Sequence, residues 1–197
     1  MEQVLNIFKE EFKKELDLVN TEYHSFTFNT SHLPKVAVYT QDKDIRMHSK
    51  FEKMFETLAN IKTNCLYWFS VSTIEEANIL KEIISHKKNE LWNHDKTICR
   101  ILPANNENKN SSIIYVGVRK GSTAKKQKVT NISGRIVQHL GYYKEGRTQG
   151  LQLAYFTNEL NIDITFHLYS LKDCPNEYLY ILEKIFAKKL RPICGKH

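Results

Sequence analysis

Apolar residues recur at two different spacings along the chain, and each spacing predicts a different kind of element. Alternation of apolar and polar residues is typical of a half-buried strand, and it is clearest at residues 162–169. Short runs rich in β-branched and aromatic residues, such as 113–118, also predict strands. The strand candidates are 23–28, 36–40, 65–72, 97–102, 113–118 and 162–169.

Apolar residues three or four positions apart predict amphipathic helices in the other segments. The helix candidates are 3–18, 49–61, 73–86, 132–140, 149–158 and 176–190. Two of them begin with a capping box, formed by Ser49 with Glu52 and by Thr73 with Glu76. Pro175 marks the start of the last helix. No repeat and no domain boundary interrupt this order, so we expect a single compact unit.

Length and composition limit the classes of protein to consider. With 197 residues, 41% hydrophobic and 26% charged, the chain is long enough for one globular domain with a real core. No apolar run approaches the ~18 residues of a membrane span, and the N-terminus lacks the pattern of a signal peptide. The four cysteines form no CxxC motif, which favours a reducing, cytoplasmic location.

The net charge of +7 fits either an ordinary basic protein or a protein that binds nucleic acid. Many of the cations follow the strand at 113–118. They are Arg119, Lys120, Lys125, Lys126 and Lys128. Such a run is usually a solvated loop, but Arg135 follows it on the next predicted helix. This concentration of positive charge suits a phosphate backbone, so we interpret the run as a DNA-binding segment.

Glu183 departs from the pattern of the last helix. It lies on the apolar stripe, between Leu182 and Phe186. A carboxylate that faces a core is costly unless it is paired or binds a metal. The alternative is a glutamate at the edge of the stripe that reaches water or a lysine.

Two further pairs of residues are candidates for chemistry. Arg135 and His139 lie four positions apart, so they project from one face of the helix at 132–140. Tyr67 and Tyr115 lie in the middle of two predicted strands. Each has a structural alternative, since surface Arg and His are common and most of the 10 tyrosines must serve packing.

Taken together, these residues resemble the GIY-YIG nuclease superfamily. The first signature strand of that family matches Leu66-Tyr67, and the second matches Tyr115-Val116-Gly117. The family's helical arginine, followed four residues later by histidine or tyrosine, matches Arg135 and His139. Its metal-binding glutamate matches Glu183. The resemblance covers residues 64–197.

The chain departs from compact members of that family in three ways. An insertion at 73–110 separates the two signature strands, and the segment from Tyr115 to Arg135 is long. Gly195 replaces an asparagine often found after the late proline. Residues 1–62 form an N-terminal extension, expected to pack on a nuclease domain at 63–197. These additions are most similar to the type II restriction endonuclease branch, with a homodimer as one alternative.

The resemblance implies an α/β (α+β) fold with a small, mainly antiparallel sheet flanked by helices. It also implies a Mg²⁺-dependent endonuclease that hydrolyses double-stranded DNA with one ion per active site. Glu183 would bind the metal, and Arg135 would contact the phosphate. The base that activates water stays open between Tyr67, Tyr115 and His139.

Two other functions remain as alternatives. The chain could be a catalytically silent DNA-binding or assembly module on the same fold. It could also be a plain basic α/β protein, which would leave the position of Glu183 unexplained.

Overall fold

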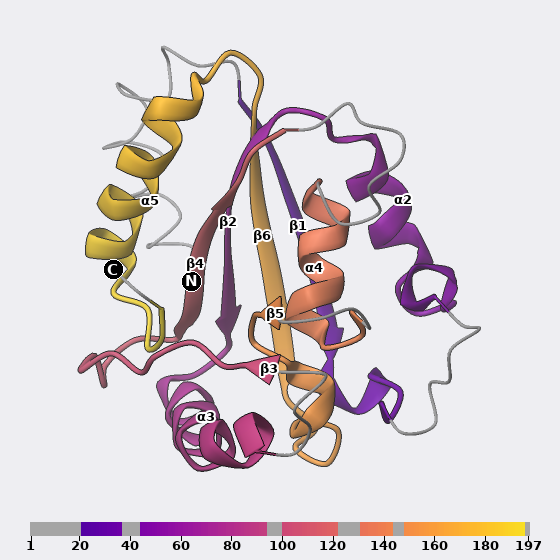
Figure 1. Ribbon diagram of the computed structural model, residues 1–197, viewed down its shortest axis with the longest axis vertical. Coiled ribbons are helices and arrows are strands. Elements are labelled where there is room, and N and C mark those ends of the chain that lie inside the picture. Colours follow the sequence, from indigo (N-terminus) through magenta and orange to yellow (C-terminus); the bar gives the residue numbers. More distant parts are fainter. Residues whose placement is uncertain (1–20, 37–43, 94–99, 122–130, 144–147, 196–197) are drawn as a thin grey trace.

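The computed structural model describes residues 21–36, 44–93, 100–121, 131–143 and 148–195. Its centre is a four-stranded sheet in which every neighbouring pair is antiparallel (Figure 1). In spatial order the strands are β1 (Thr21–Asn29), β6 (Asp163–Leu171), β2 (Asn64–Val71) and β4 (Ile113–Arg119). Two short strands, β3 (Arg100–Ile101) and β5 (Thr148–Gln149), pair in parallel beside it. The predicted α+β class and the antiparallel sheet are therefore confirmed.

Helices cover both faces of the sheet. On one face lie α4 (Ile132–Leu140) and α2 (Glu52–Asn60), and on the other lies α5 (Asn176–Leu190) (Figure 1). A fourth helix, α3 (Ile74–Asn93), follows the end of β2. Short 3-10 helices occupy Thr30–His32, Ile45–Met47 and Leu153–Tyr155.

Alternation along the central strand β2 divides the apolar residues between two cores. Tyr67 and Phe69 pack in the core that includes Ile136 of α4. Leu66 and Trp68 point to the opposite face and pack with residues of α5. Because β2 is buried on both faces, it carries almost no polar side chain, which explains its nearly continuous apolar sequence.

Most of the predicted elements in the described ranges are present. All strands predicted at 23–28, 65–72, 113–118 and 162–169 are found, and so are the helices at 132–140 and 176–190. The helix predicted at 73–86 continues to residue 93. Its capping box is confirmed, since Glu76 N donates to Thr73 Oγ1 at 3.1 Å and Thr73 N donates to Glu76 Oε2 at 3.0 Å. The predicted helix at 3–18 and most of the candidate strands at 36–40 and 97–102 lie outside the described residues.

Two predictions about helices are wrong. The segment 149–158 is not a helix: it contains the end of β5 and one 3-10 turn, and Gln152 has a φ of 55°, which breaks a right-handed helix. The capping box at Ser49 is also absent. α2 begins at Glu52 after Phe51, with no side-chain cap, because the amides of both residues donate to the His48 carbonyl instead.

The N-terminal part of the chain contributes to the sheet itself. β1 pairs with β6 along its whole length, from Thr21 opposite Leu171 to Asn29 opposite Asp163. α2 packs against α4 on the same side of the sheet. Residues 21–36 and 44–62 therefore complete the fold around the strands at 63–197. Among the described residues, no helix is long and apolar enough to cross a membrane.

A chain of polar side chains with buried Ser70 and His167 crosses the sheet on the face covered by α5. His167 of β6 shares hydrogen bonds with Ser70 Oγ at 2.8 Å and with Tyr23 Oη at 2.6 Å. The Trp68 ring stacks on the imidazole, with centroids 4.7 Å apart. Burial lowers the pKa of His167 to about 4, so this imidazole is neutral at pH 7.

We expect the free energy of unfolding to decrease as the pH falls from about 6.5 to about 4. In that range His167 takes up a proton in the unfolded chain but not in the folded one, so protonation favours unfolding by up to about 3 kcal/mol. Urea denaturation at several pH values would measure this loss. The control is His167→Gln, which should lose less stability over the same range. Equal losses in both proteins would contradict the assignment.

Candidate functional site

The hydroxyl of Tyr67 is the meeting point of two elements. Tyr67 lies on β2 and is fully buried. Its oxygen accepts a hydrogen bond from Arg135 Nε at 3.0 Å and lies 3.0 Å from His139 Nε2. Both partners come from α4, one turn apart, as their spacing in the sequence predicts. Three of the predicted site residues are thus in direct contact.

Local sequence signals place α4 over the strand. Asn131 caps its N-terminus by accepting from Gly134 N at 3.0 Å, and Gly141 ends it with a φ of 98°. Ile132, Ile136 and Leu140 form its buried stripe. The face that carries the arginine and the histidine lies beside this stripe and is brought against the Tyr67 ring.

The hydrogen bonds of His139 define its protonation. Its Nδ1 accepts from the Leu151 backbone N–H at 3.2 Å, so the neutral ring carries its proton on Nε2. Nε2 therefore donates to the oxygen of Tyr67. Burial, followed by the positive charge of Arg135, holds the pKa of His139 well below its usual range. His139 is a neutral donor here and has no free lone pair for a proton.

Arg135 is held by three further acceptors besides Tyr67. Its Nη1 donates to the Gln149 carbonyl at 2.7 Å and to Gln138 Oε1 at 2.9 Å, and a hydrogen bond links it to the Tyr115 hydroxyl. Burial opposes its charge, but its interactions with the two tyrosines prevail and raise its pKa. The side chain is a fixed cation with a defined orientation.

Gly117 allows the two tyrosines to approach each other. It pairs with Tyr67 across β2 and β4, and a Cβ there would lie 2.7 Å from Tyr67 Oη and 2.8 Å from Tyr115 Cε1. The two rings stack with centroids 6.3 Å apart. Tyr115 is only partly buried, so it is the more exposed of the two residues. Burial raises the pKa of both hydroxyls, which are therefore protonated at neutral pH.

Glu183 reaches the site around the open edge of the sheet. β4 is an edge strand, and the Val118 backbone donates a hydrogen bond to the carboxylate. Glu183 is half-buried, which raises its pKa, while the charge of Arg135 opposes this shift. Its charge also acts on Tyr67 and Tyr115. The carboxylate therefore faces the same cluster as the arginine, although it comes from the helix on the other face.

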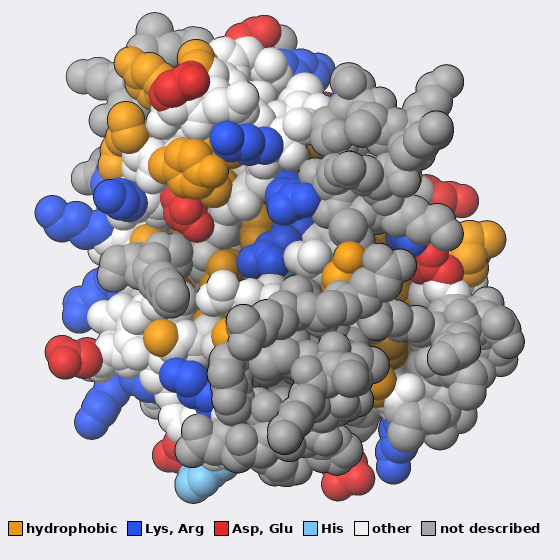
Figure 2. All heavy atoms as spheres, in the orientation of Figure 1, with side chains coloured by type: hydrophobic (Ala, Val, Ile, Leu, Met, Phe, Trp, Pro, Cys, Tyr) orange, Lys and Arg blue, Asp and Glu red, His pale blue; other side chains and the backbone are white. Residues whose placement is uncertain are grey.

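The cations predicted to bind DNA are placed only in part. Arg119, at the end of β4, is half-buried and close to Arg135, and burial followed by that neighbouring charge lowers its pKa. Lys120 lies over the Tyr180 ring of α5, 5.5 Å from its centroid. Figure 2 shows Lys and Arg side chains over α5 and between α5 and α4. Lys125, Lys126 and Lys128 lie outside the described residues.

The site offers one carboxylate to a metal. Within the described residues there is no group of three or more His, Cys, Asp and Glu side chains that could hold an ion. Glu183 fits a hard cation that keeps most of its waters and also binds a substrate phosphate, as Mg²⁺ does. The nearby tyrosine oxygens and the half-buried position of Glu183 are compatible with that kind of site.

Sequence reasoning missed the backbone groups of the site. The Gln149 carbonyl and the Leu151 amide hold Arg135 and His139, but both belong to a segment that was predicted as a helix. Gly150, between them, approaches α4 closely, since a Cβ there would lie 3.0 Å from the Gln138 carbonyl oxygen. That glycine was the available signal for a backbone contact rather than a helix.

Comparison of the chain with protein-family models, with curated proteins and with solved structures found no match. The geometry of these residues is therefore the basis for any functional assignment.

We expect Gly117→Ala to destabilise the protein by about 1–3 kcal/mol, because the new methyl group would overlap both tyrosine rings. The buried Tyr67 ring has no room to move away. Urea denaturation would measure the change. Unaltered stability would mean that the two rings pack less closely than described. Gly117→Ala should cost less stability in a Tyr115→Ala background than in the wild type, since one of the two overlaps is then absent.

Proposed function

We propose that the protein is a Mg²⁺-dependent nuclease that hydrolyses phosphodiester bonds in double-stranded DNA. The observation that carries the proposal is the convergence of Arg135, His139 and Glu183 on two stacked tyrosines. This set and its order along the chain also support membership of the GIY-YIG superfamily. The additions to the domain favour the restriction endonuclease branch.

Positive charge at the site suits a phosphodiester. Arg135 and Arg119 lie close enough to influence each other, and both are at least partly shielded from water. Two adjacent cations repel each other unless an anion lies between them or beside them. A phosphate beside them would lower this repulsion, and a fixed guanidinium stabilises the charge that grows on the phosphate oxygens during hydrolysis.

The hydrogen bonds support different roles for the three candidate bases. His139 has its proton on Nε2 and its Nδ1 occupied, so it acts as a positioning residue for Tyr67. The Tyr67 oxygen accepts two hydrogen bonds and directs its own O–H elsewhere. Tyr115 is the more exposed of the two tyrosines, so it is the better placed group to orient an attacking water.

A bound Mg²⁺ would be held by Glu183, and it would supply a water of lowered pKa and neutralise the leaving oxygen. This chemistry removes the need for a strong protein base. The tyrosines are poor candidates for such a base, because their raised pKa values keep them protonated at neutral pH.

The raised pKa values also favour a second candidate, a DNA-binding or assembly module that no longer cleaves. Incubating the protein with unmodified phage DNA, with Mg²⁺ or with a chelator, separates the two. Binding without cleavage under both conditions would select the silent module.

We expect Arg135→Lys to reduce turnover by ~10² or more and to affect DNA binding much less. Lysine keeps the positive charge but loses the planar group that joins Tyr67 Oη to the Gln149 carbonyl. Single-turnover cleavage and equilibrium binding would measure the two effects. Normal turnover would show that Arg135 does not contact the reacting phosphate.

We expect Glu183→Gln to fold, to bind DNA and to lose Mg²⁺-dependent cleavage. The amide keeps the shape of the side chain but removes the charge that would hold the ion, and it relieves repulsion of the phosphate. Thermal unfolding and cleavage would be measured on the same variant.

The matched control for this variant is Glu177→Gln, an exposed position in the first turn of the same helix. It loses the same charge and should cleave normally. Full activity in Glu183→Gln would contradict the proposed metal site, and a changed melting temperature with intact cleavage would indicate a structural role for Glu183.

A further inference from the structure

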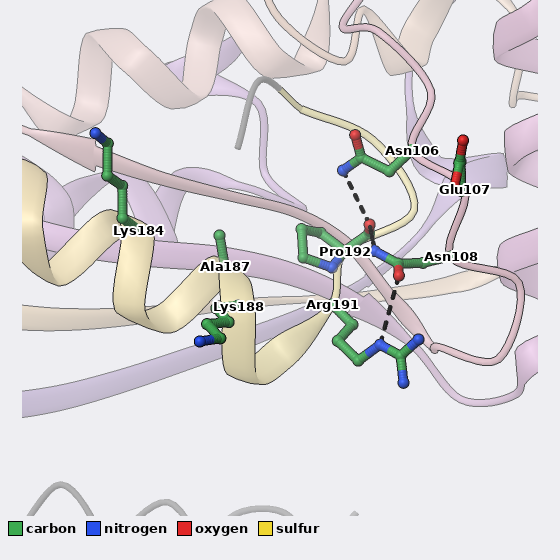
Figure 3. A pocket seen from close by; sticks show the side chains of 8 residues that line it. All are labelled: Asn106, Glu107, Asn108, Lys184, Ala187, Lys188, Arg191 and Pro192. Atoms are coloured by element: carbon green, nitrogen blue, oxygen red, sulfur yellow. Dashed lines mark hydrogen bonds between the residues drawn. The ribbon is translucent and has the colours of Figure 1, made fainter.

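A second cationic site lies at the C-terminal end of α5. It is a pocket of about 450 Å³ between the helix and the loop that precedes β4 (Figure 3). The helix and the turn after it contribute Lys184, Lys188 and Arg191, and Glu107 is the only carboxylate among the described lining residues. The lining residues are Asn106, Glu107, Asn108, Lys184, Ala187, Lys188, Arg191 and Pro192. Three cations against one carboxylate favour an anionic ligand.

Hydrogen bonds hold the loop side of the pocket to the segment after α5. Asn106 and Asn108 both donate from their side-chain amides to the Pro192 carbonyl, at 3.1 and 2.9 Å. The Asn106 backbone N–H donates to the Ile193 carbonyl at 2.8 Å. The end of the insertion at 73–110 is therefore hydrogen-bonded to the segment that follows α5, and it forms one wall of the pocket.

Arg191 adopts a backbone conformation that arginine rarely takes. It is the C-cap of α5 with a φ of 50°, a position where glycine is preferred because a side chain is strained there. Its Nε lies 3.4 Å from Asn108 Oδ1, which directs the guanidinium along the pocket wall. A strained residue at a helix end suggests that its side chain has a function.

The pocket and the candidate active site share one helix. Lys184 follows Glu183 directly, and Arg191 lies eight residues after Glu183, about 12 Å along the helix axis. The phosphates of one DNA strand advance about 3.4 Å per base pair along the duplex axis, so this distance corresponds to ~3–4 base pairs. Lys120, over the Tyr180 ring, adds another cation on the same side of the helix.

We propose that this pocket binds the phosphate backbone of the DNA substrate, ~3–4 base pairs from the bond that is cut. The inference rests on the proposed nuclease function and extends it. The contact carries no base-specific information, because every nucleotide presents the same phosphate. It fixes the register of the duplex against α5, which also carries the metal-binding Glu183.

The test is the salt dependence of binding to a duplex of about 30 base pairs, measured with a chelator present so that no cleavage occurs. The triple variant Lys184→Ala, Lys188→Ala and Arg191→Ala should bind more weakly. The slope of log K against log salt should fall by up to ~0.9 for each lost phosphate contact.

The matched control removes three exposed lysines from other parts of the surface, Lys50, Lys53 and Lys88. It has the same net charge as the triple variant, so a slope that falls equally in both would overturn the pocket and indicate a general charge effect. An unchanged slope in the triple variant would overturn it as well. If the wild-type protein does not bind the duplex at low salt, the proposed nuclease function fails and the pocket fails with it.

Arg191→Gly separates binding from folding. Glycine relieves the left-handed strain, so the melting temperature should equal or exceed that of the wild type. The affinity for DNA should nevertheless fall several-fold. A variant with wild-type affinity would show that the guanidinium does not contact the backbone.

Discussion

The hydroxyl oxygen of one buried tyrosine, Tyr67, determines how α4 is positioned against β2 in the site. The Tyr67 hydroxyl is shielded from water and would be costly to bury without partners. Arg135 Nε and His139 Nε2 both reach it, and this fixes the rotation and height of α4 against β2. The same oxygen leaves no room for a side chain on the neighbouring strand, so Gly117 is required there. The orientation of Arg135 and the close approach of the second tyrosine both depend on this oxygen, while the Leu151 amide sets the protonation of His139.

The edge of the sheet is the second constraint. β4 is an edge strand of the four-stranded sheet. The Val118 amide therefore has no neighbouring strand to pair with and donates instead to Glu183. An edge strand is the place where a residue from a helix on one face can meet residues from a helix on the other. α5 supplies the carboxylate and α4 supplies the cation, and neither needs to cross the core. The long insertion after β2 does not disturb this arrangement, because α3 and the loop before β4 lie at the end of the sheet (Figure 1).

Residue patterns in the sequence predicted the helices and strands well, but they predicted the contacts between those elements less well. Apolar spacing located α4, α5 and all four strands of the main sheet, and the spacing of Arg135 and His139 placed both on one face. The pattern did not show that His139 is completely buried, because its burial depends on the amide of Leu151 and the ring of Tyr67, which are distant in the sequence. The helix predicted at 149–158 failed for a related reason. The apolar residues of that segment do pack inward, but the Gln149 carbonyl and the Leu151 amide hold α4, and a helix would have paired that carbonyl internally.

Under the proposed function, the net charge of the site determines the order in which DNA and Mg²⁺ would bind. Among the described residues, Arg135 and Arg119 are close to each other and the half-buried carboxylate of Glu183 faces Arg135, so these three groups together carry a net positive charge before any ligand arrives. A cation alone would be repelled by the two guanidinium groups. A phosphate that binds first would offset that charge and would add an oxygen ligand beside Glu183. We therefore infer that DNA strengthens Mg²⁺ binding, and by thermodynamic linkage Mg²⁺ must strengthen DNA binding by the same factor.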